Sequence, residues 1–237
     1  MQPPGYSKSL CQEILSHGHE IGFHFDAISN AGKKKTLKSM SRLWSFTELE
    51  RQLKTLQKHT GAFPLYTNKN HYTRWEGRTE FLEWCEELGI RVDQTKGPSK
   101  CGTQGFPFGS CHPWQAMNID GKLIGCLEIS FQSQDFGLQG PEDTMDILLD
   151  GVVKAAGVAH VIFHPAHATK PRVNALMHEF ITKCKELGAS FMKSRDIGEW
   201  VFKRKLAIAK GIQDLDGASI KERDPRKKDW VPITTNS

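Results

Sequence analysis

The stretch EIGFHFDA, residues 20–27, alternates apolar and polar side chains in the pattern of a half-buried β-strand. Phe23 and Phe25 would point into a core, and His24 and Asp26 would point together to the opposite face. An imidazole beside a carboxylate at the end of a strand suits a divalent metal. The structural alternative is a core histidine that is hydrogen-bonded to a backbone carbonyl.

The composition is that of a folded chain. The 237 residues are 38% hydrophobic and 25% charged, which excludes the disordered class. No apolar run approaches the roughly 20 residues that cross a bilayer, and the first ten residues lack the apolar core of a signal peptide. We therefore expect no membrane span and a cytoplasmic location.

The net charge of +5 includes basic runs at 33–35 and 226–228. A basic patch can bind nucleic acid, but no nucleic-acid motif accompanies these runs, so we interpret them as solvated surface and do not expect a nucleic-acid partner. The six cysteines show no CxxC spacing, which disfavours a zinc ribbon, and we expect them to be reduced. Cys101 and Cys111 could bridge under oxidation. Nothing in the sequence indicates an oligomeric state.

Helical and extended patterns alternate along the chain. The expected helices are 7–17, 47–60, 77–88, 142–156, 171–187 and 195–210, and the expected strands are 20–26, 63–67, 90–95, 122–130 and 160–165. Thr47 and Glu50 would form a capping box for the second helix, and Gly61 would end it. Residues 97–114 are expected to be an ordered loop. This rhythm predicts an α/β fold, either a β/α barrel or a doubly wound sheet.

Both of these folds place functional groups at the carboxyl ends of their strands. Asp93 closes one predicted strand, where it could orient a histidine, bind a hydroxyl or cap the following turn. His164 and His167 emerge where Pro165 directs the chain out of the sheet. A histidine at this place can act as a general acid, because its usual pKa lies near working pH.

The segment TNKNHYTRWEG, residues 67–77, packs polar and aromatic residues together without a period, which is typical of a functional loop. His71 lies in its centre. The face of Trp75 could stack on a sugar ring, and Arg74 could hold a carboxylate or an oxyanion. The alternative is an ordinary capping loop.

Five stretches together resemble the polysaccharide deacetylase family over roughly residues 7–205. They are SHGHEIGFHFDA (16–27), NHYTRWEG (70–77), IRVDQT (90–95), GFPFGSCHPW (105–114) and VIFHPAH (161–167). Members of this family are metal-dependent hydrolases of acetylated carbohydrates, built on a distorted β/α barrel. The resemblance implies such a barrel over residues 1–210, followed by a charged tail or small hairpin at 211–237.

The resemblance also implies a divalent metal, most often zinc, with an aspartate as base and a late histidine as acid. His24 matches the first metal histidine of the family, and His164 matches the late catalytic histidine. We expect Asp93 as the second catalytic residue, with His71 and Asp26 completing the metal site.

The sequence departs from the family pattern in two places. Ile28 occupies the position of the second metal histidine, and no opening strand with paired aspartates is present. We therefore expect a barrel that lacks its first strand, as in a truncated copy, a short gene model or a chain that has lost catalysis.

The expected function is hydrolysis of the N-acetyl groups of a carbohydrate. The alternative is an inactive or truncated barrel that only binds glycan. The residues expected to contact substrate are Arg74, Trp75, Phe106, Gly109 and His167.

Overall fold

The computed structural model describes residues 7–29, 43–61, 64–98, 104–138 and 144–209. Both basic runs, Cys101 and the tail or hairpin predicted at 211–237 lie outside these ranges. The helices are α1 (Lys8–Ser16), α3 (Phe46–Thr60), α4 (Glu80–Glu87), α5 (Thr144–Ala155), α6 (Pro165–Ala168), α7 (Pro171–Glu186) and α8 (Ser194–Ala209), with 3-10 turns η1 (His71–Thr73) and η2 (Pro107–Gly109). The strands are β1 (Thr67–Asn68), β2 (Val92–Asp93), β3 (Trp114–Met117), β4 (Leu123–Glu128), β5 (Ser133–Gln134) and β6 (Val161–Ile162).

The strands form one sheet of order β1-β2-β4-β3 and one pair, β5-β6. β1, β2 and β4 are parallel, as are β5 and β6, and Phe23 makes a parallel bridge to Asn68 beside β1. The predicted α/β class with parallel strands is therefore confirmed. Within the described residues these strands make two open sheets, and they do not close into a barrel.

Several predicted strands are shorter than expected. The stretch 20–26 contributes only the bridge at Phe23, and the strand expected at 122–130 ends at Glu128. β3 was not predicted, because its four residues fall at the end of an irregular stretch. It pairs antiparallel with β4 through a turn in which Asn118 Oδ1 accepts the backbone N–H groups of Asp120 and Lys122.

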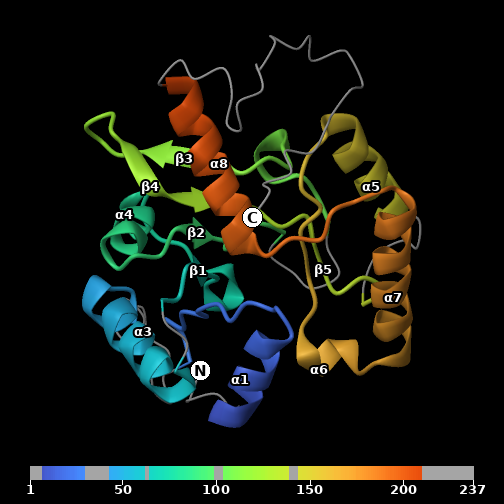
Figure 1. The fold of residues 1–237 in the computed structure, drawn as a ribbon, viewed down its shortest axis with the longest axis horizontal. Coiled ribbons are helices and arrows are strands. Elements are labelled where there is room, and N and C mark those ends of the chain that lie inside the picture. Colours follow the sequence, from blue (N-terminus) through green and yellow to red (C-terminus); the bar gives the residue numbers. More distant parts are fainter. Residues whose placement is uncertain (1–6, 30–42, 62–63, 99–103, 139–143, 210–237) are drawn as a thin grey trace.

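Two apolar clusters fill the interior. The first gathers around Phe25, Leu49 and Phe81, and the second lies around Leu148 and Phe180. Figure 1 shows α3 and α4 on one side of the strands, α5 and α7 on the other, and α8 running across the middle. None of the described helices is both long and apolar enough to cross a membrane.

The motif GHEIG ties the first described segment to its neighbours. Gly22 lies close against β1: a Cβ at this position would lie 2.7 Å from Thr67 Oγ1, so a larger residue would displace that side chain. Glu20 Oε2 accepts the backbone N–H of Arg195 at 3.1 Å. The start of α8 is thereby anchored to the segment that carries His24.

The N-cap of α3 lies two residues before the one that the capping-box prediction named. Ser45 is its N-cap, and its hydroxyl accepts the backbone N–H of Glu48 at 3.3 Å. Thr47 and Glu50 lie inside the helix, where Glu50 pairs with Lys54. Gly61 ends the helix in a left-handed conformation, as predicted.

Candidate functional site

Polar residues occupy the carboxyl end of every parallel strand. They are Asn70 and His71 after β1, Asp93 and Thr95 at β2, Glu128 and Ser130 at β4, Asp135 after β5, and His164 after β6. The carboxyl ends of the parallel strands therefore carry the polar side chains, as the sequence predicted for functional groups. These side chains differ in burial and in the partners they have.

Asp135, His164 and His167 form a group that could hold a metal ion, since one ligand atom from each lies within 4.8 Å of the others. Asp135 Oδ2 contacts Nδ1 of His164 at 2.6 Å and Nδ1 of His167 at 2.9 Å. The carboxylate is fully buried, whereas the two imidazoles are 41% and 27% exposed. Two imidazoles thus converge on one carboxylate oxygen while keeping access to solvent.

The local sequence builds this group. His164 is the N-cap of α6 and Pro165 takes the first helical position, where the absent N–H of proline costs nothing. His164 and His167 are three residues apart on this turn and so share one face. Asp135 is fixed to the adjoining strand, because its N–H donates to Ile162 O at 2.8 Å and its Oδ1 accepts the N–H of His164 at 2.7 Å.

Asp135 has two further marks of a specialised position. Its backbone lies in the left-handed region at φ 49°, which aspartate tolerates better than most residues. Burial on its own would raise the pKa of this carboxyl, but the hydrogen bonds from His167 and His164 outweigh that effect and lower the pKa. The group therefore presents an ionised oxygen to the two imidazoles.

His24 and His71 are brought together, as the sequence predicted for a shared site. His24 Nε2 lies 3.2 Å from His71 Nδ1, and the rings meet edge to face. Burial and the charge of Lys69 lower the pKa of His24 to about 4, and burial also lowers the pKa of His71. The charge of His164 acts on His71 in the same direction, so this pair and the Asp135 group belong to one neighbourhood.

Asp26 does not complete a metal group with these two histidines in the described part of the chain. Its Oδ1 accepts the backbone N–H groups of Ile28 at 2.9 Å and Ser29 at 2.8 Å, which is the hydrogen bonding of an Asx turn. The side chain is almost fully buried. Of the three predicted metal ligands, the structure brings together the two histidines.

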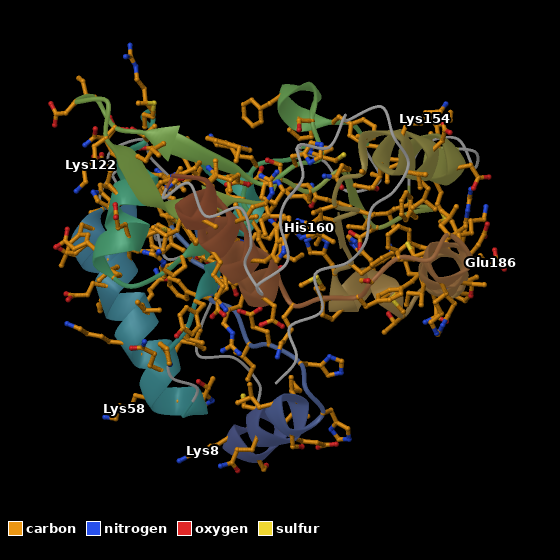
Figure 2. All side chains as sticks on the ribbon, turned by 45° about the horizontal axis from the view of Figure 1, so that its top comes forward. Lys8, Lys58, Lys122, Lys154, His160 and Glu186 are labelled. Atoms are coloured by element: carbon orange, nitrogen blue, oxygen red, sulfur yellow. The ribbon has the colours of Figure 1, made fainter. Side chains whose placement is uncertain are left out.

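The core-histidine alternative describes His160 instead of His24. His160 Nδ1 lies 2.9 Å from Ile129 O, so it donates to that carbonyl. Burial lowers the pKa of His160 to about 4. Figure 2 shows His160 in the middle of the molecule, while Lys8, Lys58, Lys122 and Lys154 lie at separate margins.

Asp93 belongs to a buried row in which Asn68, Asp93 and Glu128 stand in register on three neighbouring strands. Asp93 Oδ1 accepts from Asn68 Nδ2 at 2.7 Å and from the hydroxyl of Thr95 at 2.9 Å, and its Oδ2 accepts the N–H of Thr95 at 3.1 Å. All three members of the row are at most 1% exposed. Asp93 lies at a strand end as predicted, but it serves partners inside the fold.

Glu128 is the unusual member of this row. Its Oε1 accepts the backbone N–H of Lys96 at 2.9 Å. Burial raises the pKa of Glu128 well above its usual range, and the neighbouring charge of Asp93 raises it further. Both effects favour the protonated, neutral form of this side chain.

Arg74 and Trp75 also have partners inside the fold. Arg74 donates to Ala27 O and to Glu76, and its guanidinium lies over the ring of Trp44. The Trp75 ring supports the ammonium of Lys96, which lies 3.4 Å from the ring centroid. These contacts favour the capping-loop alternative for Arg74 and Trp75.

The residues of the predicted substrate loop 105–114 also differ in their surroundings. Phe106 packs against the second apolar cluster, close to Gly151 of α5. Gly109 adopts φ 65° and allows η2 to turn. His167 is the predicted contact residue that the structure places in the metal-capable group, and Cys111 is a buried, free thiol.

Sequence reasoning missed Asp135, although a signal was present. The two-residue strand β5 was not predicted, so the acidic residue in SQDFG that follows it lay in unassigned chain. Residues 130–135 (SFQSQD) are all buried in the structure, and five of the six are polar. An acid that closes a buried strand is the pattern that identified Asp93, and it would have identified Asp135.

Comparison of the chain with protein-family models, with curated proteins and with solved structures gives no match. The interpretation of the site rests on its residues and geometry.

Proposed function

We propose that this chain is a divalent-metal-dependent hydrolase that removes acetyl groups from the amide nitrogen of an N-acetylated carbohydrate. The observation that carries the proposal is the convergence of Asp135, His164 and His167 at the ends of two parallel strands. One carboxylate and two imidazoles are the donor set of many catalytic zinc sites, in which three protein ligands leave a fourth position open. The exposure of both imidazoles provides that open side.

A bound zinc ion would activate a water molecule and polarise the acetamide carbonyl. Residues near the ion would accept and donate the protons of the reaction. One proton lies in the hydrogen bond between His24 Nε2 and His71 Nδ1. The lowered pKa values favour the neutral form of both imidazoles, and a neutral pair can accept a further proton. We assign the role of base to this pair, because Asp93 is sealed into the buried row.

The resemblance to polysaccharide deacetylases supports the amide substrate. It matches His24 and His164, two residues on the same edge of the molecule. The parallel order from Phe23 through β1 and β2 to β4, followed along the chain by the parallel pair β5-β6, is compatible with the β/α barrel of that family. We therefore propose that the chain forms a barrel of this kind.

A second ligand set follows from the same resemblance. In that arrangement His24 and His71 bind the metal, and Asp135 orients His164 as the general acid. The short contact between Asp135 and His164 suits this role as well. Substitutions at His167 and at His24 separate the two arrangements, because each belongs to only one ligand set.

The test is release of acetate from N-acetylglucosamine oligomers by the full chain loaded with zinc. We expect chelation to abolish release and added zinc to restore it. Asp135→Asn and His167→Ala should lower the rate at least about 100-fold, because each removes a ligand. Asp120→Asn and His178→Ala, which alter exposed residues on the β3–β4 turn and on α7, are the matched controls and should act like the parent chain.

Failure would take one of two forms. Metal binding without acetate release from any N-acetylated oligomer would favour the barrel that only binds glycan. A chain that binds no metal after reconstitution would contradict the hydrolase.

A further inference from the structure

The turn η1 contains two consecutive non-glycine residues in the left-handed backbone region. Tyr72 adopts φ 54° and ψ 26°, and Thr73 adopts φ 52°. This conformation is unfavourable for residues with a Cβ, and for a β-branched threonine it is a marked outlier. Strain of this kind persists where the surrounding structure imposes it, and it concentrates at functional sites.

The residues on either side of this pair are firmly held. The N–H of His71 donates to Phe25 O at 2.8 Å, which fixes the start of the turn. Asn70, which is buried, donates its N–H to Thr95 Oγ1 at 2.9 Å and its Nδ2 to Arg74 O at 3.0 Å. Arg74 in turn donates to Ala27 O. These hydrogen bonds hold Asn70 and Arg74 in place, so the chain between them projects outward.

The projected side chain is an aromatic ring. Tyr72 is 73% exposed, although a ring of this size is normally covered. Its ring meets the ring of His71 edge to face, with centroids 4.4 Å apart, and His71 contacts His24. The ring thus stands directly beside the proposed base, with one face open to an incoming molecule.

A second ring in the described chain shares these properties but has a different neighbourhood. Phe108 is 68% exposed at φ 60°, and its ring contacts Trp114. Figure 1 shows its turn, in green, at the top of the view and away from α6. Phe108 therefore supplies a matched comparison for an exposed, strained aromatic residue outside the site.

We propose that Tyr72 is a substrate-contacting residue whose ring forms a stacking surface for a sugar ring of the N-acetylated substrate. This inference rests on the proposed function and adds to it a specificity-determining residue. The face of an aromatic ring matches the flat C–H face of a sugar, and its hydroxyl can remain in water. The strained backbone keeps the ring in place before substrate arrives, which reduces the entropic cost of binding.

The test separates the ring from the strain. Tyr72→Ala removes the ring only, Tyr72→Gly removes both, and Tyr72→Phe keeps the ring. With acetate release from N-acetylglucosamine oligomers as the assay, we expect about a tenfold rise in KM for the first two variants, which is the size of a stacking contact. Tyr72→Phe should behave as the parent chain. Tyr72→Gly should also melt at a higher temperature than Tyr72→Ala.

Phe108→Gly is the control, and it should leave KM unchanged. An active parent chain whose KM is unaffected in both Tyr72→Ala and Tyr72→Gly would overturn the stacking surface and leave the proposed hydrolase standing. An equal rise in KM for Phe108→Gly would also overturn it, since any exposed ring would then have the same effect. A parent chain that releases no acetate would overturn the proposed function, and the stacking surface with it.

Discussion

Two groups of polar side chains lie at the strand ends, and they differ in what their atoms face. In the buried row of Asn68, Asp93 and Glu128, each member is almost inaccessible, and the Asp93 carboxylate accepts three hydrogen bonds. In the group of Asp135, His164 and His167, the carboxylate is buried but the imidazoles reach solvent. A position at a strand end therefore does not make a residue catalytic. Convergence of ligand atoms together with access is what makes the second group the candidate metal centre.

The largest expected effect is on stability, at Asp93. Asp93→Ala leaves the donors of Asn68 and Thr95 without an acceptor in the interior and should lower the free energy of unfolding by about 3–5 kcal/mol. Asp93→Asn keeps one acceptor oxygen but sets an amide N–H against a buried donor, so it should cost less, about 1–2 kcal/mol. Urea unfolding of both variants measures the difference.

The same pair of variants can break the comparison. If Asp93→Asn kept its stability but lost acetate release by orders of magnitude, Asp93 would be catalytic as the sequence suggested, and the buried row would be part of the active site.

Glu128 should give the row a pH dependence of opposite sign to ordinary acid denaturation. The raised pKa means that the folded chain keeps this proton above the usual value of 4.5, while the unfolded chain has released it. Stability should fall as pH rises, by up to about 1.4 kcal/mol per pH unit for this single proton. Glu128→Gln should remove that slope from unfolding curves measured above the usual pKa of 4.5.

Glu186→Gln is the matched control, because Glu186 is exposed on α7 and lies at the edge of the molecule in Figure 2. Its unfolding curves should keep the slope of the parent chain. A slope that is equal in the parent chain and in Glu128→Gln would mean that Glu128 is ionised in the folded state.

The smallest effect on stability should come from the partly exposed group of Asp135, His164 and His167, here called the open group. His167→Ala removes a half-exposed side chain and one hydrogen bond, so it should cost about 1 kcal/mol or less. A loss as large as that of Asp93→Ala would show that the open group is structural, and the contrast between the two groups would disappear.

Much of the helical framework could be predicted from the sequence, because its signals are local. The amphipathic period of α3 and the glycine that ends it specify that helix, and the spacing of His164, Pro165 and His167 marks a turn with two imidazoles on one face. The first residue of α3 was predicted wrongly. Ser45 and Thr47 are both good capping residues, and tertiary packing selects between them.

The rest depends on contacts between distant parts of the chain. Strands of two residues have no period of their own, so nothing local reveals that Asn68, Asp93 and Glu128 fall in register. Arg74 lies over Trp44, and Trp75 lies under Lys96, and both partners are distant in the sequence. These contacts occupy both side chains inside the fold, and the sequence does not reveal them. The pairing of His24 with His71 was predicted from the resemblance and from the character of the loop, whereas Asp135 was missed because β5, the two-residue strand before it, was not predicted.

The most direct test of the central claim is metal content, measured by mass spectrometry on the purified chain after reconstitution with zinc. We expect about one zinc ion per chain. His167→Ala and Asp135→Asn should lose it, and His24→Ala and the control His178→Ala should retain it. Zinc that is lost in His24→Ala and His71→Ala but kept in His167→Ala would place the metal on the histidine pair and contradict the assignment. A chain that takes up no zinc would contradict the metal centre altogether.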